Sequence, residues 1–402
     1  MILKNRFFLF NETQNQGKSM HGRRYDEEVK KFAVTLHYHS PKAYAFCRTI
    51  LKLPHPSAIR NWNSTVNASP GLERQVLDGL KNIPEQDRDC NLVIDSMACH
   101  AFPEAQQIIW DEQQHRFVGY CDYGNGITLE KNESEAKEAL VFVLVSLNEK
   151  WKWPIAYFFK HSITTPILKE WIETALILTA EVQISVRSIT CDGDSVNCSV
   201  FRELGCNIFV DNFADLENSF SHPTLNYNVR ILLDACHMLK LCRNALADYG
   251  IFNSVDGQIK WSYIQNLHNF QQQLIFKFKN RLNAQCIEWW QNKMKVRYVA
   301  SLEAKDGTKL IKTGRRTFIY GFALALKSIL EVAEDIFNER PHYKYLLTYK
   351  FSQDHAEILF GKIRSRHGFN NNPNVLQFKY ATKQILMRND DTIGKSLFIE
   401  TL

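Results

Sequence analysis

Four acidic side chains in this sequence have the placement needed to hold divalent cations. Asp354 and Glu357 are three residues apart, so on a helix both carboxylates fall on one face. Asp95 and Asp192 each close a short apolar run that is typical of a buried strand. Carboxylates from two strand ends and one helix are the oxygen ligands that hold two Mg²⁺ or Mn²⁺ ions against a phosphodiester. We therefore predict Asp95, Asp192 and Glu357 as catalytic metal ligands.

Each of these acids also has a simpler explanation. A lone aspartate after a strand is usually a turn or capping residue, and we interpret Asp194 as a loop acid of that kind. Asp354 could cap its helix, where a carboxylate favours the N-terminal dipole. It could equally contact a metal or a nucleotide from the outer shell. The metal hypothesis therefore depends on Asp95, Asp192 and Glu357 occurring together.

The elements that must position these acids follow from the hydrophobic pattern. Apolar runs predict strands at residues 91–97, 116–120, 139–147, 186–191 and 228–233, with helices at 165–180 and 195–204. Three strands, a helix, a strand, a helix and a strand is the order of an RNase H-like α/β fold. Metal-dependent nucleases of that fold place their acids on the first strand and after the fourth.

Further domains flank and interrupt this core. Asp192 and Glu357 are 165 positions apart (357 − 192), and long helical patterns at 263–282 and 318–337 fill the interval. We predict an all-helical insertion at 245–345, between core segments 85–244 and 346–390. Short helical patterns at 22–72, one of them with Ser40-Pro41 as N-cap and first residue, predict a helix-turn-helix domain. Polar residues at 11–21 predict that the segment 1–21 is a flexible lead-in.

The same residues carry a family resemblance. The segment from Gln353-Asp354-His355 to Asn372-Pro373 resembles the C-terminal catalytic block of P-element-type DNA transposases, a family that includes vertebrate members with an N-terminal THAP zinc finger. The likeness continues in family order from about residue 22 to 390. Residues 25–62 resemble the helix-turn-helix, 92–98 the first acidic strand, 190–193 the second acid, and 234–244 the entry to the insertion domain.

The resemblance implies a second cofactor, GTP, bound by the insertion domain. Asp234 and Lys240, six residues apart, match the pair that helps to hold the nucleotide in the family. Asn244 shares the helix face of Lys240, and Asp354 completes the predicted cofactor-binding set. No Walker A glycine loop is present, so this is not a P-loop site. Without the resemblance, the same residues would be a polar helix start packed under the sheet.

Composition sets wider limits. The 402 residues are 45% hydrophobic and 23% charged, which is typical of a globular protein of two or three domains. A net charge of +6 suits a nucleic-acid partner. Ten cysteines without a C-x-x-C pair indicate a reducing compartment, and we expect the family's zinc finger to be absent. No apolar stretch is long enough to span a membrane.

The leading functional hypothesis is a P-element-like DNA transposase, or a host-retained derivative, that cuts and joins DNA by a two-metal mechanism. The resemblance implies transposon ends and target DNA as partners, a homo-oligomer and a nuclear location. The alternative is a domesticated, non-transposing derivative that binds DNA or protein. A generic RNase H-like nuclease would fit the acids but not the flanking domains. Without a finger, we expect the helix-turn-helix to bind DNA with little sequence preference.

Overall fold

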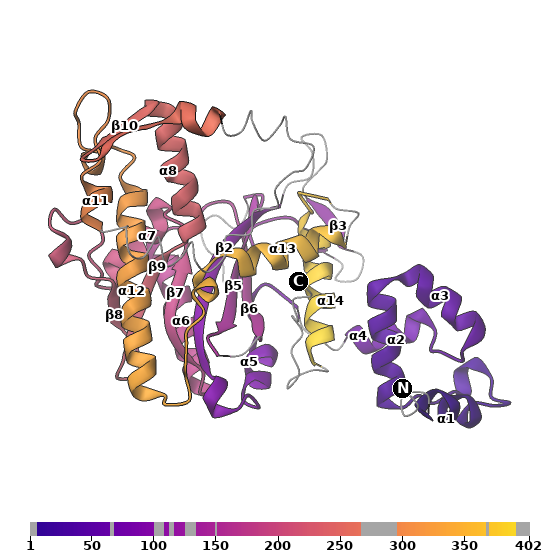
Figure 1. The fold of residues 1–402 in the computed structure, drawn as a ribbon. Helices are drawn as coiled ribbons and strands as arrows, with labels where there is room; N and C mark the ends of the chain where they lie inside the picture. The colour runs from indigo at the N-terminus through magenta and orange to yellow at the C-terminus, as the bar shows by residue number, and fades with distance from the viewer. Residues whose placement is uncertain are drawn as a thin grey trace.

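A mixed β-sheet forms the centre of the protein (Figure 1). The computed structural model describes residues 6–64, 68–99, 108–111, 116–124, 134–148, 151–266, 296–366 and 370–390. Within them the sheet has seven strands. Across the sheet these are β1 (Gly71–Leu72), β6 (Lys152–Lys160), β5 (Glu138–Ser146), β2 (Asp89–Ala98), β7 (Ser185–Cys191), β9 (Asn228–Leu233) and β8 (Ser219–Ser221).

The direction of the central strands decides where the acids meet. Strand β2 is antiparallel to β5 but parallel to β7, and β7 is parallel to β9. The carboxyl ends of β2, β7 and β9 therefore lie at one edge of the sheet. This is the RNase H-like arrangement that the order of the elements predicts. We call this edge the acid edge, because Asp95, Asp192 and Asp234 lie there.

One predicted strand has a different place, and a long strand of the sheet, β6, was not predicted. Strand β4 (Arg116–Val118), expected as the second strand of the sheet, instead pairs with β3 (Ile109–Asp111) in a separate hairpin. Its place is taken by β6, which contains Pro154. A proline argues against a strand because it cannot donate to the ladder. Here the register shifts between Phe142 and Val143, opposite this proline, so an irregularity of the ladder accommodates it.

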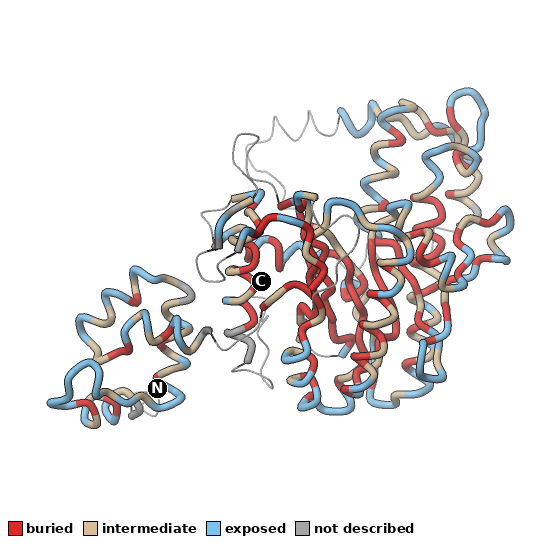
Figure 2. Tube along the Cα trace, turned by 180° about the vertical axis from the view of Figure 1, so that it is seen from behind, coloured by how far each residue is buried: buried red, intermediate tan, exposed pale blue. Residues whose placement is uncertain are grey.

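Helices cover both faces of the sheet. Alternate residues of β2 point to opposite sides, so Leu92 and Ile94 pack in one core and Val93 in another. The first core includes α5 (Arg74–Leu80), α6 (Thr165–Glu181) and α7 (Ser195–Glu203). The second includes α13 (Asp354–Ser365) and α14 (Val375–Asp390). Figure 2 shows the buried residues concentrated along the strands between these layers.

The insertion is not helical throughout. Helix α8 (Ala235–Tyr249) leaves the end of β9 and is followed by a hairpin of β10 (Ile251–Ser254) and β11 (Gly257–Lys260), where only helices were expected. Residues 267–282 of the helix predicted at 263–282 lie outside the described residues. After α11 (Val296–Ala300), the long α12 (Thr317–Glu339) returns and packs against α8, β9 and β7. Helix α12 is therefore part of the packing of the core.

The N-terminal helices form a small unit beside the core (Figure 1). The predicted flexible lead-in is wrong, because residues within it form α1 (Arg6–Gln14). The ring of Phe8 packs edge-on against Phe32. The side-chain amide of the buried Asn15 donates to Arg24 O and accepts from Arg24 N. The predicted N-cap is confirmed, since Ser40 Oγ accepts from Ala43 N at 3.0 Å. The other helices of the unit are α2 (Glu27–His39), α3 (Pro41–Ile50) and α4 (Pro56–Ser64).

No described helix combines the length and the apolar character required to cross a membrane.

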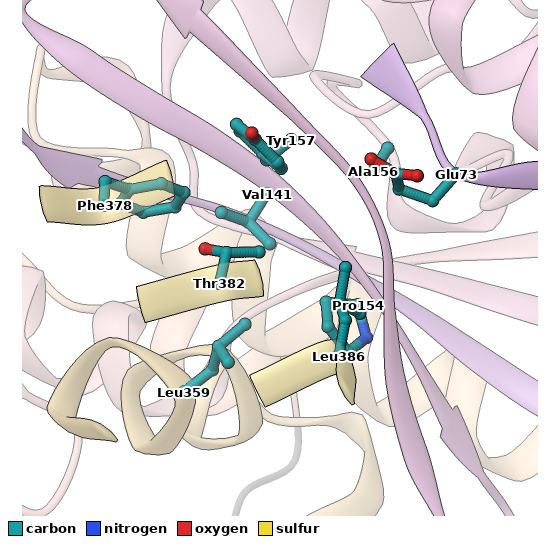
Figure 3. Close-up of a pocket in the computed structure, with 9 residues that line it drawn as sticks. All are labelled: Glu73, Val141, Pro154, Ala156, Tyr157, Leu359, Phe378, Thr382 and Leu386. Carbon is teal, nitrogen blue, oxygen red and sulfur yellow. The ribbon is translucent and has the colours of Figure 1, made fainter. Parts of the chain in front are cut away.

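A small cavity between the sheet and the two C-terminal helices encloses an acidic side chain (Figure 3). Its walls are mostly apolar, with Tyr157 from β6, Leu359 from α13 and Phe378 from α14. Glu73 is only 4% exposed, and its Oε1 has no hydrogen-bond partner among the described residues. Burial raises the pKa of this carboxyl from 4.5 to about 7.

We expect Glu73 to make the folded protein less stable as the pH rises. Between pH 4.5 and about 7 the folded chain keeps a proton that the unfolded chain has lost, so the free energy of unfolding falls through this window. The full loss is on the order of 3 kcal/mol. Glu73→Gln should remove this part of the pH dependence, measured by urea unfolding at several pH values. Glu181→Gln, on the exposed end of α6, should leave the wild-type slope, and an unchanged slope in Glu73→Gln would contradict the assignment.

Candidate active site

Three aspartates lie at the acid edge because the strand registers align them. Val93 of β2 is opposite Thr190 of β7, and Asp95 and Asp192 each follow two residues later. Cys191 of β7 is opposite Leu233 of β9, and Asp234 is the next residue after Leu233. Parallel strands in register bring such positions side by side. The structure thus brings the two predicted strand acids together and adds a third carboxylate.

The pKa of Asp95 is raised above its ordinary value. Its Oδ1 accepts a hydrogen bond from Ser96 N at 2.8 Å. Burial raises the pKa of Asp95, the Ser96 hydrogen bond opposes this, and the negative charges of Glu357, Asp192 and Asp234 reinforce it, so the pKa is about 7. A cluster of carboxylates that destabilise one another's charge is a place where a cation would be strongly favoured.

Asp192 is held in place by its own loop. Its Oδ1 accepts from Asp194 N at 3.1 Å and from Asn197 Nδ2 at 2.7 Å. Asn197 was not predicted, because a single asparagine in the first turn of α7 gives no sequence signal. A Cβ on Gly193 would lie 2.7 Å from Thr317 Cγ2, so only glycine allows α12 to begin this close behind Asp192.

Glu357 reaches the acid edge from α13. This helix packs over β2 and β5. Across that contact the negative charge of Glu357 acts on Asp95. Glu357 itself is exposed, and its Oε2 lies 3.7 Å from Arg364 Nη1 on the same helix. The structure therefore places all three predicted ligands at one edge, two of them on strand ends and one on an exposed helix face.

The donor chemistry suits divalent cations, although the ligands are not fully assembled. Carboxylate oxygens are the ligands that Mg²⁺ and Mn²⁺ prefer. Among the residues that the structure describes, no three His, Cys, Asp or Glu side chains are arranged so that they could hold one metal ion. The site would therefore need side-chain movement, most simply of the exposed Glu357, to close around a cation.

The predicted cofactor residues have separate places. Asp234 is buried, and its two carboxylate oxygens accept from His237 N and Gln353 N, at 2.7 and 2.9 Å. Lys240 is exposed on α8, one helical turn before Asn244, so these two share a face. Asp234 and Lys240 do not contact each other among the described contacts, and their predicted pairing at one nucleotide stays a prediction. Asp234 instead caps α8 and binds the start of the α13 helix.

Asp354 is the first residue of α13, next to the N-cap Gln353. Partial burial and the charge of Asp234 raise its pKa, against a hydrogen bond to Ser352. The side chain of the N-cap Gln353 makes no capping bond, and the place of Asp354 in the first turn favours the helix dipole. Both interpretations of Asp354, the capping role and the outer-shell role, therefore stay predictions.

A buried basic cluster under α13 was not predicted. Lys152 Nζ lies 3.4 Å from His355 Nδ1, and His355 Nε2 lies 3.2 Å from Tyr349 O. Burial, with the positive charges of Lys152 and Lys350 nearby, lowers the pKa of His355 to about 4, so the ring is neutral. The ring links Lys152 of β6 to the backbone of Tyr349 by hydrogen bonds. Lysines at these positions follow no periodicity in the sequence, so only the fold shows that they meet.

The fold and its acid edge define an RNase H-like protein interrupted by an insertion domain. Four family models match the chain in the same order. They are described as a transposable element P transposase-like HTH domain (residues 2–62), a TNP-like RNase H N-terminal domain (68–205), a TNP-like GTP-binding insertion domain (236–312) and a TNP-like RNase H C-terminal domain (349–383). The chain therefore belongs to the P element transposase-like family.

Curated relatives agree with this assignment. The human DNA transposase THAP9 is 29% identical over 255 residues, which is 62% of this chain and 27% of that protein. The transposable element P transposase of Drosophila melanogaster is 20% identical and covers 94% of this chain and 56% of that protein. The chain thus spans less than two thirds of either relative.

A solved structure shares the fold. A chain of the Drosophila P element transposase strand transfer complex superposes with a TM-score of 0.74 and 17% sequence identity, covering 98% of both chains. At this identity the match shows the fold alone. The matched insertion domain ends at residue 312, before α12, in agreement with the packing of that helix on the core.

We expect Asp95→Asn to have opposite effects with and without cations. At about pH 8 without metal, it should raise the melting temperature, because it removes a carboxylate whose ionisation is opposed by burial and by neighbouring acids. In Mn²⁺ the wild type should instead melt at the higher temperature, since only the wild type gains the full free energy of cation binding. Thermal melting measures both. Asp256→Asn, in the exposed hairpin turn, should leave the melting temperature unchanged both without metal and in Mn²⁺. A shift of the same sign in both conditions would count against the metal site.

Proposed function

We propose that this chain cuts and joins DNA as a P-element-type transposase, or as a host-retained derivative of one. The observation that supports this most directly is the alignment of Asp95 and Asp192 at one sheet edge, with Glu357 within electrostatic reach. The proposed partners are transposon ends and target DNA, acted on by a homo-oligomer in the nucleus. The names of the relatives, a DNA transposase and a P element transposase, support the same substrate class.

The roles of the residues follow from their contacts. Asp95 and Asp192 would supply oxygen ligands from fixed backbone positions, with Asn197 orienting the Asp192 carboxylate. Glu357 would supply the third ligand from α13. A pair of divalent cations, when bound, would supply charge stabilisation at the scissile phosphate and activate water or a 3′-hydroxyl. Arg364, near Glu357, is placed to contact a phosphate beside these acids.

A domesticated derivative that binds DNA or protein without transposing is the second candidate. The specific observation that favours it is the incomplete ligand cluster, since no three described acids already form a cation site. The two candidates share the fold and the DNA-binding unit. They differ in whether the acid edge cleaves a phosphodiester, so a cleavage assay separates them.

We expect Asp192→Asn to abolish DNA cleavage and strand transfer in Mg²⁺. The loss should exceed about 100-fold, since outer-shell partners of metal ligands alone cost 10–100-fold. DNA binding should be retained, with little sequence preference and a steep salt dependence. The measurements are cleavage of labelled duplex DNA and fluorescence anisotropy over a salt series.

The matched control is Asp194→Asn. Asp194 lies two residues away and is exposed, and its side chain makes no capping bond to α7. It should cleave at close to the wild-type rate. Equal losses in both variants would mean that the loop, rather than the Asp192 carboxylate, determines activity. Absence of cleavage by the wild type would favour the domesticated derivative.

We also propose that the insertion binds GTP through the α8 face that carries Lys240 and Asn244. The matched insertion-domain model supports this, although its residues 267–295 lie outside the described part of the chain. Lys240 would supply a charge for phosphate. Asp234 is left out of this face, because its carboxylate is buried and already accepts from two backbone amides.

We expect GTP to raise the melting temperature more than ATP does. Binding to the native state alone adds about 2.7 kcal/mol at 100 times Kd, and Lys240→Ala should remove most of this gain. Lys305→Ala, exposed in a loop of the insertion, should keep the full shift. Hydrolysis is not expected, because no water-positioning or P-loop element is present in the sequence. Equal shifts with GTP and ATP would argue against a guanine-specific site.

A further inference from the structure

A buried hydrogen-bond network joins the backbone positions next to all three predicted ligands. Its first member, Asp234, is 3% exposed. Its backbone N–H donates to Cys191 O at 2.8 Å, directly before Asp192. Its carboxylate oxygens accept from His237 N at the start of α8 and from Gln353 N at the start of α13. A single residue therefore fixes the end of β7 against the beginning of two helices.

The second member, Gln353, extends the network to β2. Its side-chain Nε2 donates to Ile94 O at 2.9 Å, and Ile94 directly precedes Asp95. Its backbone oxygen accepts from Ala356 N and Glu357 N, at 2.9 and 3.1 Å, so the first turn of α13 depends on where it lies. Gln353 thus couples the backbone of Asp95 to the backbone of Glu357.

We propose that Asp234 and Gln353 are positioning residues that set where Glu357 lies relative to Asp95 and Asp192. The inference rests on the proposed function, because it assigns the distances that a metal-dependent reaction needs. Functional groups must be held within about 0.5 Å of their productive geometry. The side-chain contacts of the three ligands are made within their own loops or helix. The pairing of β2 with β7 already aligns Asp95 and Asp192, so the network is what joins Glu357 on α13 to them.

The chemical identity of Asp234 supports this role. A helix N-cap alone is served equally well by asparagine. A carboxylate differs because both of its oxygens accept, and here each oxygen has one backbone N–H. An asparagine would turn an N–H₂ group toward one of these donors. Burying the charge of Asp234 near Asp95 costs free energy. The carboxylate offsets part of this cost because it accepts from two backbone N–H groups at once.

Two substitutions test the proposal in the full 402-residue chain. Asp234→Asn removes one of the two acceptors, and Gln353→Met removes the donor to Ile94 at nearly unchanged volume. The matched control is Asn218→Ala, which removes a buried side-chain bond to Ser328 Oγ (3.0 Å) on α12.

The first measurement is amide hydrogen exchange of the metal-free protein. Both variants should speed exchange at residues 353–357 by at least about 10-fold relative to the control, because these amides lose their anchor. The second measurement is the Mn²⁺ concentration that half-saturates binding, followed by the paramagnetic signal of free Mn²⁺. It should rise by about 10–100-fold in both variants and stay unchanged in the control, while DNA affinity is retained.

The outcomes separate the two proposals. Unchanged exchange and an unchanged half-saturating concentration would overturn the positioning role, even if the variants melted at lower temperature. If Asp234→Asn did not fold, Gln353→Met would decide by the same measurements. A wild-type chain that neither bound Mn²⁺ nor cleaved DNA would instead overturn the proposed function, and the exchange data would still show whether the network holds α13.

Discussion

The structure depends on how β2 holds the chain that returns from the insertion. The returning segment follows β2 in the direction of that strand, and a side-chain hydrogen bond or ion pair fixes it at three points. These are Asp89 with Arg340 Nε (3.1 Å), Asn91 Nδ2 with Lys350 O (3.0 Å) and Ile94 O with Gln353 Nε2 (2.9 Å). Because the last point directly precedes Asp95, the path of the returning chain determines where α13 begins. A residue distant in sequence thereby becomes part of the acid edge.

These contacts contribute more to the choice of arrangement than to the total stability. A satisfied neutral hydrogen bond contributes only about 1 kcal/mol net, whereas a buried group left without a partner costs roughly 1–3 kcal/mol. Asn91 is buried and binds Thr190 and Ser188 as well as Lys350. Any other docking of α13 would leave several of these groups unsatisfied together. The polar side chains on one face of β2 therefore select one placement of the helix from those that apolar packing alone would allow.

The sequence predicted what depends on periodicity and missed what depends on distant partners. Strand ends fix Asp95 and Asp192, so the pattern located these two acids, while their selection as metal ligands depended on the family resemblance. Strand β6 was missed because Pro154 argues against a strand unless the irregular ladder opposite it is known. Helix α1 was missed because its polar Asn11 is buried, where it accepts a hydrogen bond from Asn15, which also bonds Arg24. The role of Gln353 depends on contacts 119 and 259 positions away, and no local pattern encodes such contacts.

The acid edge combines fixed ligands with one adaptable ligand. Asp192 is fixed by its loop, and Asp95 lies in a strand that pairs on both sides, so the backbone of Asp95 cannot move without breaking the sheet. Glu357 is exposed and bound only loosely to Arg364 among its described contacts. Its side chain can therefore rotate toward Asp95 while the start of α13 stays anchored. Ionised acids oppose this closure, as the raised pKa of Asp95 indicates. A cation reverses that balance, so binding of the cation would itself complete the site.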